Sequence, residues 1–189
     1  ENYNINVRAR QGVLTSVNGK ATLKVMQTTG EWDKDYGWMA WNRTNFLNSE
    51  AQKITNCYGY VLTNGYFFID DSVENVRNFL LDSGYKSSQA STKSNFKVGD
   101  ILLWEGHIIE AIGTKNGKVT WDSYFGFDSS PIKGSLQEVM NYNKEFGKHY
   151  GNLQGATLYR QQDQSKIKFG QKKYEPVDVK TIQQQKNSY

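Results

Sequence analysis

The sequence predicts an α+β fold in which short helices lie on one side of a mostly antiparallel sheet. Alternating apolar and polar residues flank two Asn-Gly pairs, at 18–19 and 116–117, and this pattern is typical of β-hairpins. Apolar residues at helical spacing occur between the two hairpins, at 57–63 and 71–84. Strands, then helices, then a meander of strands give an α+β layer arrangement.

The first 30 residues predict a two-stranded hairpin. Two alternating runs flank the turn at Asn18-Gly19, namely Ile5, Val7 and Ala9, then Ala21, Leu23 and Val25. The following segment, 31–45, is irregular and rich in aromatic residues. Trp38 and Trp41 in this segment are candidate substrate contacts in a cleft, and packing of a loop on the core is the alternative.

Two helices are predicted in the middle of the chain. Residues 57–63 place Tyr58, Val61 and Leu62 at helical spacing, and Asn64-Gly65 supplies the usual end of a helix. The second helix begins after an N-cap at Asp71-Ser72 and stops at Gly84. Its apolar stripe consists of Val73, Val76, Phe79 and Leu80.

The second half of the chain predicts a meander of strands. Residues 86–95 are rich in Ser, Lys and Gln and predict a surface loop. A short helix is expected after Gly134, and a last strand at 156–159. The meander itself has three predicted strands, at 96–104, 107–112 and 118–125.

Length and composition favour one domain with a tail. The 189 residues suffice for a single core. We expect this domain to span 1–160, with 1–45 as an N-terminal part that matches no pattern, and 161–189 to form a polar, extended or partly disordered tail. The tail has six Lys against two Asp and one Glu, so it carries +3 of the net charge of +4.

The charge distribution argues against two classes of partner. A folded part near neutrality does not fit a nucleic-acid groove, and no run approaches the ~18 apolar residues of a membrane span. Tyr and Trp are abundant among Asn, Gln, Ser and Thr. We interpret this as a surface for polar polymers such as glycans or peptidoglycan, with ordinary core aromatics as the alternative.

Cys57, the only cysteine, and His107, one of two histidines, are the candidates for catalysis. A thiol attacks a carbonyl as thiolate and needs a base within hydrogen-bond reach. Cys57 begins a predicted helix, and His107 begins a predicted strand 50 residues later. Asp100, between them, is expected to be structural. The second histidine, His149, is expected at the surface of a polar loop.

Metal and cofactor chemistry are not expected. A zinc site usually takes three or four Cys, His or carboxylate ligands, and two histidines with one cysteine are poor material for it. No cofactor is predicted. A lone cysteine with apolar neighbours is more often a small buried residue than a nucleophile. The case for a catalytic role of Cys57 therefore depends on the sequence around it.

Three motifs resemble the NlpC-type cell-wall peptidases, and the CHAP-type amidases of the same papain-like superfamily share the plan. Asn56-Cys57-Tyr58-Gly59-Tyr60-Val61 resembles the start of the nucleophile helix, and Val98-Gly99-Asp100-Ile101-Leu102-Leu103-Trp104 resembles the strand before the histidine. Gly106-His107-Ile108-Ile109-Glu110-Ala111-Ile112-Gly113 resembles the histidine strand. The match covers about residues 50–126, roughly 40% of the 189 residues.

The chain departs from the family pattern in two positions of the cysteine motif. Asn56 stands where the family usually has Asp, and Tyr58 where it usually has Ser. The Tyr-x-Trp-Gly-Gly stretch often found upstream is absent. Tyr58 is retained as a candidate substrate contact. The departures affect the substrate more than the fold.

The resemblance implies a third, polar residue that orients His107 from the following strand. The matching position is Asp122, with Asp128 as the rival. A two-residue loop at Asn116-Gly117 pairs Ala111 with Asp122 and His107 with Gly126. His107 and Asp122 then share a face but lie four residues apart, so a twist or a bulge must shorten the gap.

The resemblance implies a papain-like cysteine hydrolase of amide bonds, with peptidoglycan as the substrate class. Cys57 attacks the carbonyl as a thiolate, His107 acts as acid and base, and the Cys57 backbone N–H is an oxyanion donor together with Gln52 or Asn56. The expected place is secreted, periplasmic or at a bacterial cell wall, as a monomer.

Three alternatives remain open at the level of sequence. A chain that begins at Glu1 without a leader, with an unmatched start and a polar tail, fits an antibacterial toxin domain cut from a larger polypeptide, with an immunity or inhibitor protein as partner. A protein-directed protease or deamidase uses the same machinery. The hypothesis that involves no enzyme activity is a non-catalytic module that binds glycans or cell wall through the aromatic segment.

Overall fold

The computed structural model describes residues 7–30, 55–63, 65, 67–125, 131–146, 153–162 and 180–183. These residues form two antiparallel sheets and three helices, which confirms the α+β class. The first sheet has the order β10-β1-β2-β3. Its strands are β1 (Val7–Thr15), β2 (Thr22–Gly30), β3 (Phe68–Ile69) and β10 (Lys180–Gln183).

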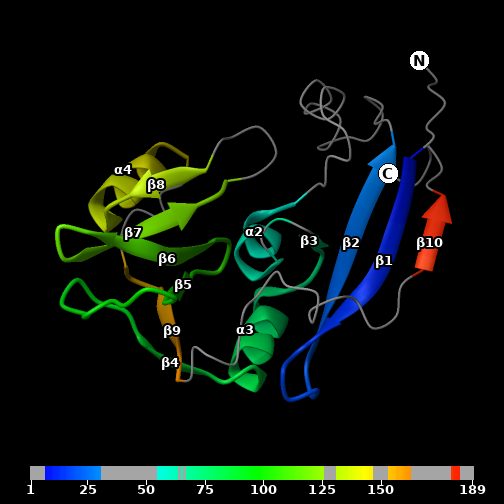
Figure 1. Cartoon of the computed structure of the whole chain (residues 1–189), viewed down its shortest axis with the longest axis horizontal. Coiled ribbons are helices and arrows are strands. Elements are labelled where there is room, and N and C mark those ends of the chain that lie inside the picture. The colour runs from blue at the N-terminus through cyan, green and yellow to red at the C-terminus, as the bar shows by residue number, and fades with distance from the viewer. Residues whose placement is uncertain are drawn as a thin grey trace.

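The second sheet is larger and has the order β4-β9-β5-β6-β7-β8. Its strands are β4 (Tyr85–Gln89), β5 (Ile101–Leu103), β6 (Ile108–Lys115), β7 (Lys118–Ser123), β8 (Ile132–Gly134) and β9 (Thr157–Gln161). The helices are α2 (Cys57–Thr63), α3 (Val73–Asp82) and α4 (Leu136–Phe146). Figure 1 shows α2 and α3 between the two sheets and α4 beside β7 and β8.

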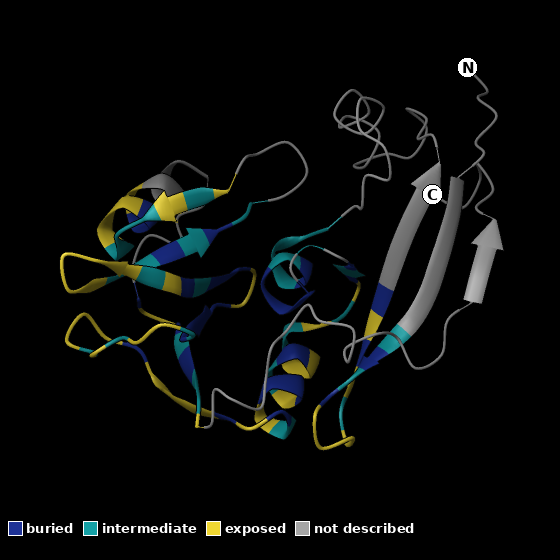
Figure 2. Cartoon of the chain, viewed as in Figure 1, coloured by how far each residue is buried: buried dark blue, intermediate teal, exposed yellow. Residues whose placement is uncertain are grey.

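Helices cover both faces of the second sheet, and not one face as the sequence predicted. Successive strand residues point to opposite faces, and Ile101, Leu103 and Ile108 join a core with α2 and α3. Leu102 and Ile109 join a separate core with α4. The buried side chains therefore form two cores, one on either side of the sheet, and Figure 2 shows buried positions in its strands and in α2, α3 and α4.

Local signals in the sequence set several elements. In the β6–β7 turn, Asn116 and Gly117 have φ values of 54° and 75°, which a two-residue hairpin turn requires. Helix α3 begins where the Ser72 hydroxyl accepts a hydrogen bond from the N–H of Asn75, and Gly84 follows its end with a φ of 91°. Both predictions are confirmed.

The sequence did not predict four of the strands, namely β3, β4, β8 and β10. Residues of β4 lie in the expected surface loop, but they pair with β9 along five residue pairs. Only Tyr85 of this strand is buried, because β4 is the edge of the sheet. Residues of β10 belong to the expected tail and pair with β1 from Arg8↔Gln183 to Gln11↔Lys180. This part of 161–189 therefore belongs to the first sheet.

An ion pair between Arg160 and the buried Asp100 holds β9 in its place between β4 and β5. Arg160 donates from Nε to Asp100 Oδ1 at 2.8 Å and from Nη2 to Asp100 Oδ2 at 2.7 Å. Asp100 is fully buried and also accepts the N–H of Lys97 at 2.7 Å. A two-pronged pair of this kind holds both partners in one orientation. The structural role predicted for Asp100 is confirmed.

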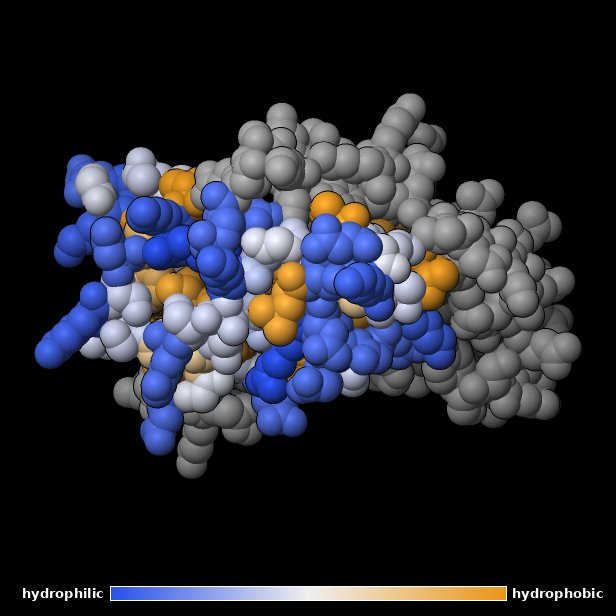
Figure 3. All heavy atoms as spheres, turned by 90° about the horizontal axis from the view of Figure 1, so that it is seen from below, coloured by the Kyte–Doolittle hydropathy of each residue, from blue (hydrophilic) through white to orange (hydrophobic). Residues whose placement is uncertain are grey.

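The surface of the described residues is mostly polar. Seen from below, hydrophobic side chains form small separate patches among hydrophilic ones (Figure 3). The large apolar side chains that stand exposed come from separate elements, and they are Val17, Leu81, Val98 and Ile112. Within the described part of the chain, no helix has the length and hydropathy that crossing a membrane needs.

Candidate functional site

The site is built around the first turn of α2. The Asn56 side chain caps this helix, because its Oδ1 accepts the N–H of Gly59 at 2.9 Å. The same oxygen accepts the N–H of Ile69 at 3.2 Å, and Nδ2 donates to the Ile69 carbonyl at 2.8 Å. The amide of Asn56 therefore ties α2 to β3. Its Nδ2, predicted as a possible oxyanion donor, already donates to the Ile69 carbonyl.

Gly59 allows α2 to lie directly on the chain before β3. A Cβ at this position would come within 1.8 Å of the Phe67 carbonyl oxygen, and Thr55 Oγ1 donates to the same oxygen at 2.8 Å. No side chain fits between helix and backbone at that separation. Gly59 of the cysteine motif thus lets α2 pack close to this backbone, which in turn sets the position of Cys57.

The Cys57 sulfur lies among backbone N–H groups. The residue as a whole is partly exposed, but protein atoms crowd its sulfur, and the backbone N–H groups of Cys57, Tyr58 and Ile108 act to lower the pKa of the thiol. Burial has the largest effect and raises the pKa of the thiol to about 12, against the opposing effect of these donors. The thiol carries its proton at neutral pH, which differs from the thiolate predicted from the sequence.

The His107 imidazole is buried between two aromatic rings. Phe125 stacks on it at a centroid distance of 4.6 Å, and Trp104 lies at 6.4 Å. His107 Nε2 is 2.8 Å from Ser123 Oγ. Desolvation lowers the pKa of His107 to about 4, so the ring is neutral at physiological pH.

The residue on the His107 ring nitrogen is Ser123, and Asp122 lies elsewhere. The predicted register was wrong, because Ile112 forms a β-bulge between the pairs Ala111↔Trp121 and Gly113↔Thr120. Beyond the bulge Glu110 pairs with Asp122, so the Asp122 side chain points to the face of Glu110. The bulge that was expected to bring Asp122 closer to His107 instead turns it to the opposite face.

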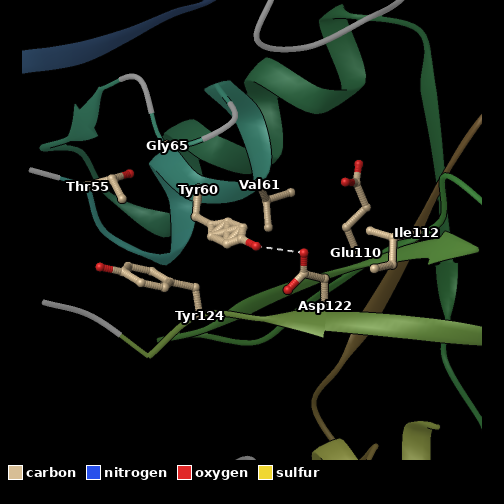
Figure 4. A pocket seen from close by; sticks show the side chains of 8 residues that line it. All are labelled: Thr55, Tyr60, Val61, Gly65, Glu110, Ile112, Asp122 and Tyr124. Carbon is tan, nitrogen blue, oxygen red and sulfur yellow. Dashed lines mark hydrogen bonds between the residues drawn. The ribbon is translucent and has the colours of Figure 1, made fainter. Parts of the chain in front are cut away.

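Asp122 faces α2 and accepts a hydrogen bond from Tyr60. The Tyr60 hydroxyl donates to Asp122 Oδ2 at 2.7 Å (Figure 4). Among the described residues none donates to the other oxygen, Oδ1, which is buried. Tyr60 and Tyr124 approach each other with ring centroids 5.0 Å apart. Asp122 is thus part of a second polar group, on the α2 face of the sheet.

This polar group lines a cavity of about 350 Å³. The described residues that line it come from α2, β6, β7 and the adjoining loops, and they are Thr55, Tyr60, Val61, Gly65, Glu110, Ile112, Asp122 and Tyr124. Desolvation raises the pKa of Glu110 to about 7, with the charge of Asp122 as the second cause. Burial also raises the pKa of Tyr60, and its hydrogen bond to Asp122 adds to the effect.

Cys57 and His107 approach the same point of the sheet from its two faces. Ser123 pairs with Ile109 on the face toward α4, and Cys57 comes from α2 on the other face. Ile108, which directly follows His107, is the nearest connection between them, because its backbone N–H acts on the pKa of the Cys57 thiol. A hydrogen bond between thiol and imidazole stays a prediction.

The remaining predicted residues divide into two groups. Tyr58 is partly buried against the core that contains α2 and α3. The others lie outside the described residues, and they are Trp38, Trp41, Gln52, Asp128 and His149. Glu110 and Ser123 were not predicted. Gly113, which interrupts an alternating run, is the signal that could have indicated the bulge and hence both residues.

Neither a group of metal ligands nor a similarity to known proteins indicates which reaction the site could catalyse. In the ranges that the structure describes, no three or more His, Cys, Asp or Glu side chains gather in a way that could hold a metal ion. No protein-family model, no curated protein and no solved structure matches the chain. The function therefore has to be argued from the site itself.

Proposed function

We propose that the chain is a papain-like cysteine hydrolase that cleaves an amide bond, with the peptide part of peptidoglycan as the substrate class. The observation that carries the proposal is that Cys57 is the first residue of α2, and that the backbone N–H of Ile108, the residue after His107, acts on the Cys57 thiol to lower its pKa against the effect of burial. The resemblance of the three motifs supplies the substrate class.

The protonation states favour general-base catalysis over a preformed ion pair. Cys57 has a raised pKa and His107 a lowered one, so both are uncharged in the resting protein. A neutral imidazole can accept a proton. We infer that the thiol gives up its proton only as its sulfur attacks the substrate carbonyl, with His107 as the acceptor.

The proposal assigns Ser123 as the positioning residue. For His107 Nδ1 to accept the thiol proton, the ring proton must sit on Nε2 and be donated to Ser123 Oγ, which lies 2.8 Å away. Because the two side chains approach from opposite faces of the sheet, His107 Nδ1 must contact the Cys57 sulfur past the first residue of β6. The imidazolium that results then protonates the leaving amine, which leaves a thioester on Cys57 and a neutral ring.

Hydrolysis completes the cycle. His107 takes a proton from water, the hydroxide adds to the thioester, and the thiolate leaves and is reprotonated. The products are a carboxylic acid, an amine and the free thiol. The backbone N–H groups of Cys57, Tyr58 and Ile108, which act on the thiol, are the candidate donors for the oxyanion that forms in both steps.

Mass spectrometry of peptidoglycan tests the proposal. Purified sacculi of several chemotypes are incubated with the wild type, with Cys57→Ser and with Glu74→Gln, an exposed glutamate of α3 that serves as control. We expect new amine and carboxyl termini with the wild type and the control, and none with Cys57→Ser. Release of ammonia or cleavage of a protein substrate instead would identify a deamidase or protease of the same mechanism.

A non-catalytic binding module is the second candidate, and one observation favours it. The thiol and the imidazole are both buried and uncharged, as structural residues usually are. This candidate predicts that the protein retains its cell-wall ligand without any turnover, and that Cys57→Ser leaves binding unchanged. The same incubation, followed by a pull-down of sacculi, separates the two.

A further inference from the structure

The cavity on the α2 face contains a pair of acidic side chains without a basic partner. Glu110 and Asp122 are directly opposite each other on β6 and β7. Both side chains extend from the sheet toward α2 (Figure 4). Among the described residues, no Lys or Arg forms an ion pair with either of them. The described residues that line the cavity include no basic side chain.

The hydrogen bonds of this pair are also incomplete. Asp122 accepts one bond, from the neutral Tyr60 hydroxyl, and its buried Oδ1 has no donor among the described residues. A buried polar atom in a native protein normally has a partner. Burial of Glu110 is costly for its charged form, and the like charge of Asp122 adds to that cost; both raise the pKa of Glu110. A cation placed between them removes this cost.

The other walls fit an organic cation on an alkyl chain. The rings of Tyr60 and Tyr124 lie 5.0 Å apart beside the acidic pair, and aromatic faces attract cations. Val61 and Ile112 supply apolar surface, and Ile112, 41% exposed, stands where the bulge meets solvent. A volume of about 350 Å³ accommodates a small ligand or one side chain.

We propose that this cavity is a recognition site for a primary ammonium group on an alkyl chain. The ammonium has three donors, and Glu110, Asp122 and Tyr60 offer oxygen acceptors from three different elements. A metal ion is disfavoured because the described residues do not bring three metal-binding side chains together. A guanidinium group prefers both oxygens of one carboxylate, and at Asp122 the Tyr60 hydroxyl already occupies one of them.

The site adds a specificity to the proposed hydrolase, and this second step rests on the proposed function. Tyr60 is three residues after Cys57 in α2, one helical turn away, and Tyr124 lies beside Tyr60 in the wall of the cavity. The cavity is therefore within the reach of one substrate side chain from the sulfur. The preferred substrate is then a peptide amide with a lysine-like side chain next to the bond that is cut.

Binding of n-butylammonium tests the site without any catalysis. Its affinity is measured by calorimetry or NMR titration, and n-butanol is the neutral control of the same length. We expect n-butylammonium to bind at least about tenfold more tightly than n-butanol. Asp122→Asn and Glu110→Gln keep the shape and should each weaken binding about tenfold, whereas Glu74→Gln, outside the cavity, should not change it.

Several outcomes would overturn the site. Equal affinity for n-butanol would make the cavity merely apolar. Stronger binding of n-butylguanidinium, or displacement of n-butylammonium by equimolar Mg²⁺ or Ca²⁺, would assign it to another cation. Unchanged affinity in both Asp122→Asn and Glu110→Gln would place the binding elsewhere, provided that both variants unfold cooperatively like the wild type.

The failure of the site and the failure of the proposed function can be told apart. Turnover of a lysine-containing peptide amide is compared with that of its norleucine analogue, in the wild type and in Asp122→Asn. A preference for lysine that Asp122→Asn abolishes supports both inferences. Binding of n-butylammonium without any turnover would contradict the proposed hydrolase and support the ammonium site. Turnover without a preference for lysine would show that the site does not determine specificity.

Discussion

The two faces of the β6–β7 hairpin bury titratable groups in opposite ways. On the face toward α4, His107 lies between aromatic rings and its Nε2 is bonded to Ser123. On the face toward α2, Glu110 and Asp122 stand opposite each other, and Tyr60 supplies the only hydrogen bond to Asp122 that the described residues show. One face is neutral and paired, and the other is acidic and incompletely paired.

The difference teaches that complete pairing and ligand binding make opposite demands on a buried group. A paired, uncharged histidine keeps one position, as a base in a mechanism must. Acidic groups without partners cost stability in the empty protein and are satisfied when a ligand binds. The pH dependence of stability should therefore have opposite signs on the two faces, and the following variants measure it.

The largest effect is expected from His107 in acid. Its pKa is lowered to about 4, so the unfolded chain takes up a proton below pH 6.5 before the folded protein does. The free energy of unfolding should fall by about 2–3 kcal/mol from pH 7 to pH 4.5 on this account. Urea unfolding of Glu110→Gln at the two pH values isolates the effect. A flat profile in that variant would contradict it.

Glu110 should act in the opposite direction. Its pKa is raised to about 7, so the folded protein binds the proton more tightly and loses stability as the pH rises from about 4.5 through 7. With a discount for its partial exposure, the loss is on the order of 2 kcal/mol. Glu110→Gln should stabilise the protein by this amount at pH 8 and leave it unchanged at pH 4.5. Destabilisation at pH 8 would show that a basic group pairs with Glu110.

Removal of the Ser123 hydroxyl should cost less. Ser123→Ala leaves the buried Nε2 of His107 without its partner, at a cost of about 1–2 kcal/mol at pH 7. Ser88→Ala, at an exposed position of β4, is the matched control. For a positioning role, Ser123→Ala should also lower kcat more than KM and shift the pH profile of kcat. A loss of stability with unchanged kinetics would leave Ser123 a purely structural role.

The smallest effect is expected from Tyr60. Tyr60→Phe removes the only donor to Asp122 among the described residues and should destabilise the protein by about 1 kcal/mol at pH 7. The aromatic wall remains, so n-butylammonium binding should weaken only a few-fold. Thermal unfolding and the same titration measure both quantities. A loss of binding as large as in Asp122→Asn would show that the hydroxyl, and not the acidic pair, dominates recognition.

Local signals predicted much of the frame that holds the site. Asn116-Gly117 defined the hairpin, Ser72 defined the start of α3, and the cysteine motif placed Cys57 at the first residue of α2. Each of these depends on residues close in sequence, where turn and capping preferences act directly. The α+β class followed from the same elements.

The assignment of faces could not be predicted in the same way. One extra residue, Ile112, moves Asp122 from the expected position to the opposite face and puts Ser123 on the His107 ring nitrogen, because alternation has a period of two. The pairing of β10 with β1 joins segments about 170 residues apart, and β4 is polar because it is an edge. The pKa values of Cys57 and His107 depend on burial that no motif encodes.

The central claim is that a neutral His107, oriented by Ser123, serves as the base at the site. ¹⁵N NMR of the imidazole measures this directly in the wild type, Ser123→Ala and Asp122→Asn, with His149→Gln for assignment. We expect a neutral ring with its proton on Nε2 down to about pH 5, disturbed by Ser123→Ala and unchanged by Asp122→Asn. An imidazolium at pH 7, or a ring that responds to Asp122→Asn instead, would contradict the account.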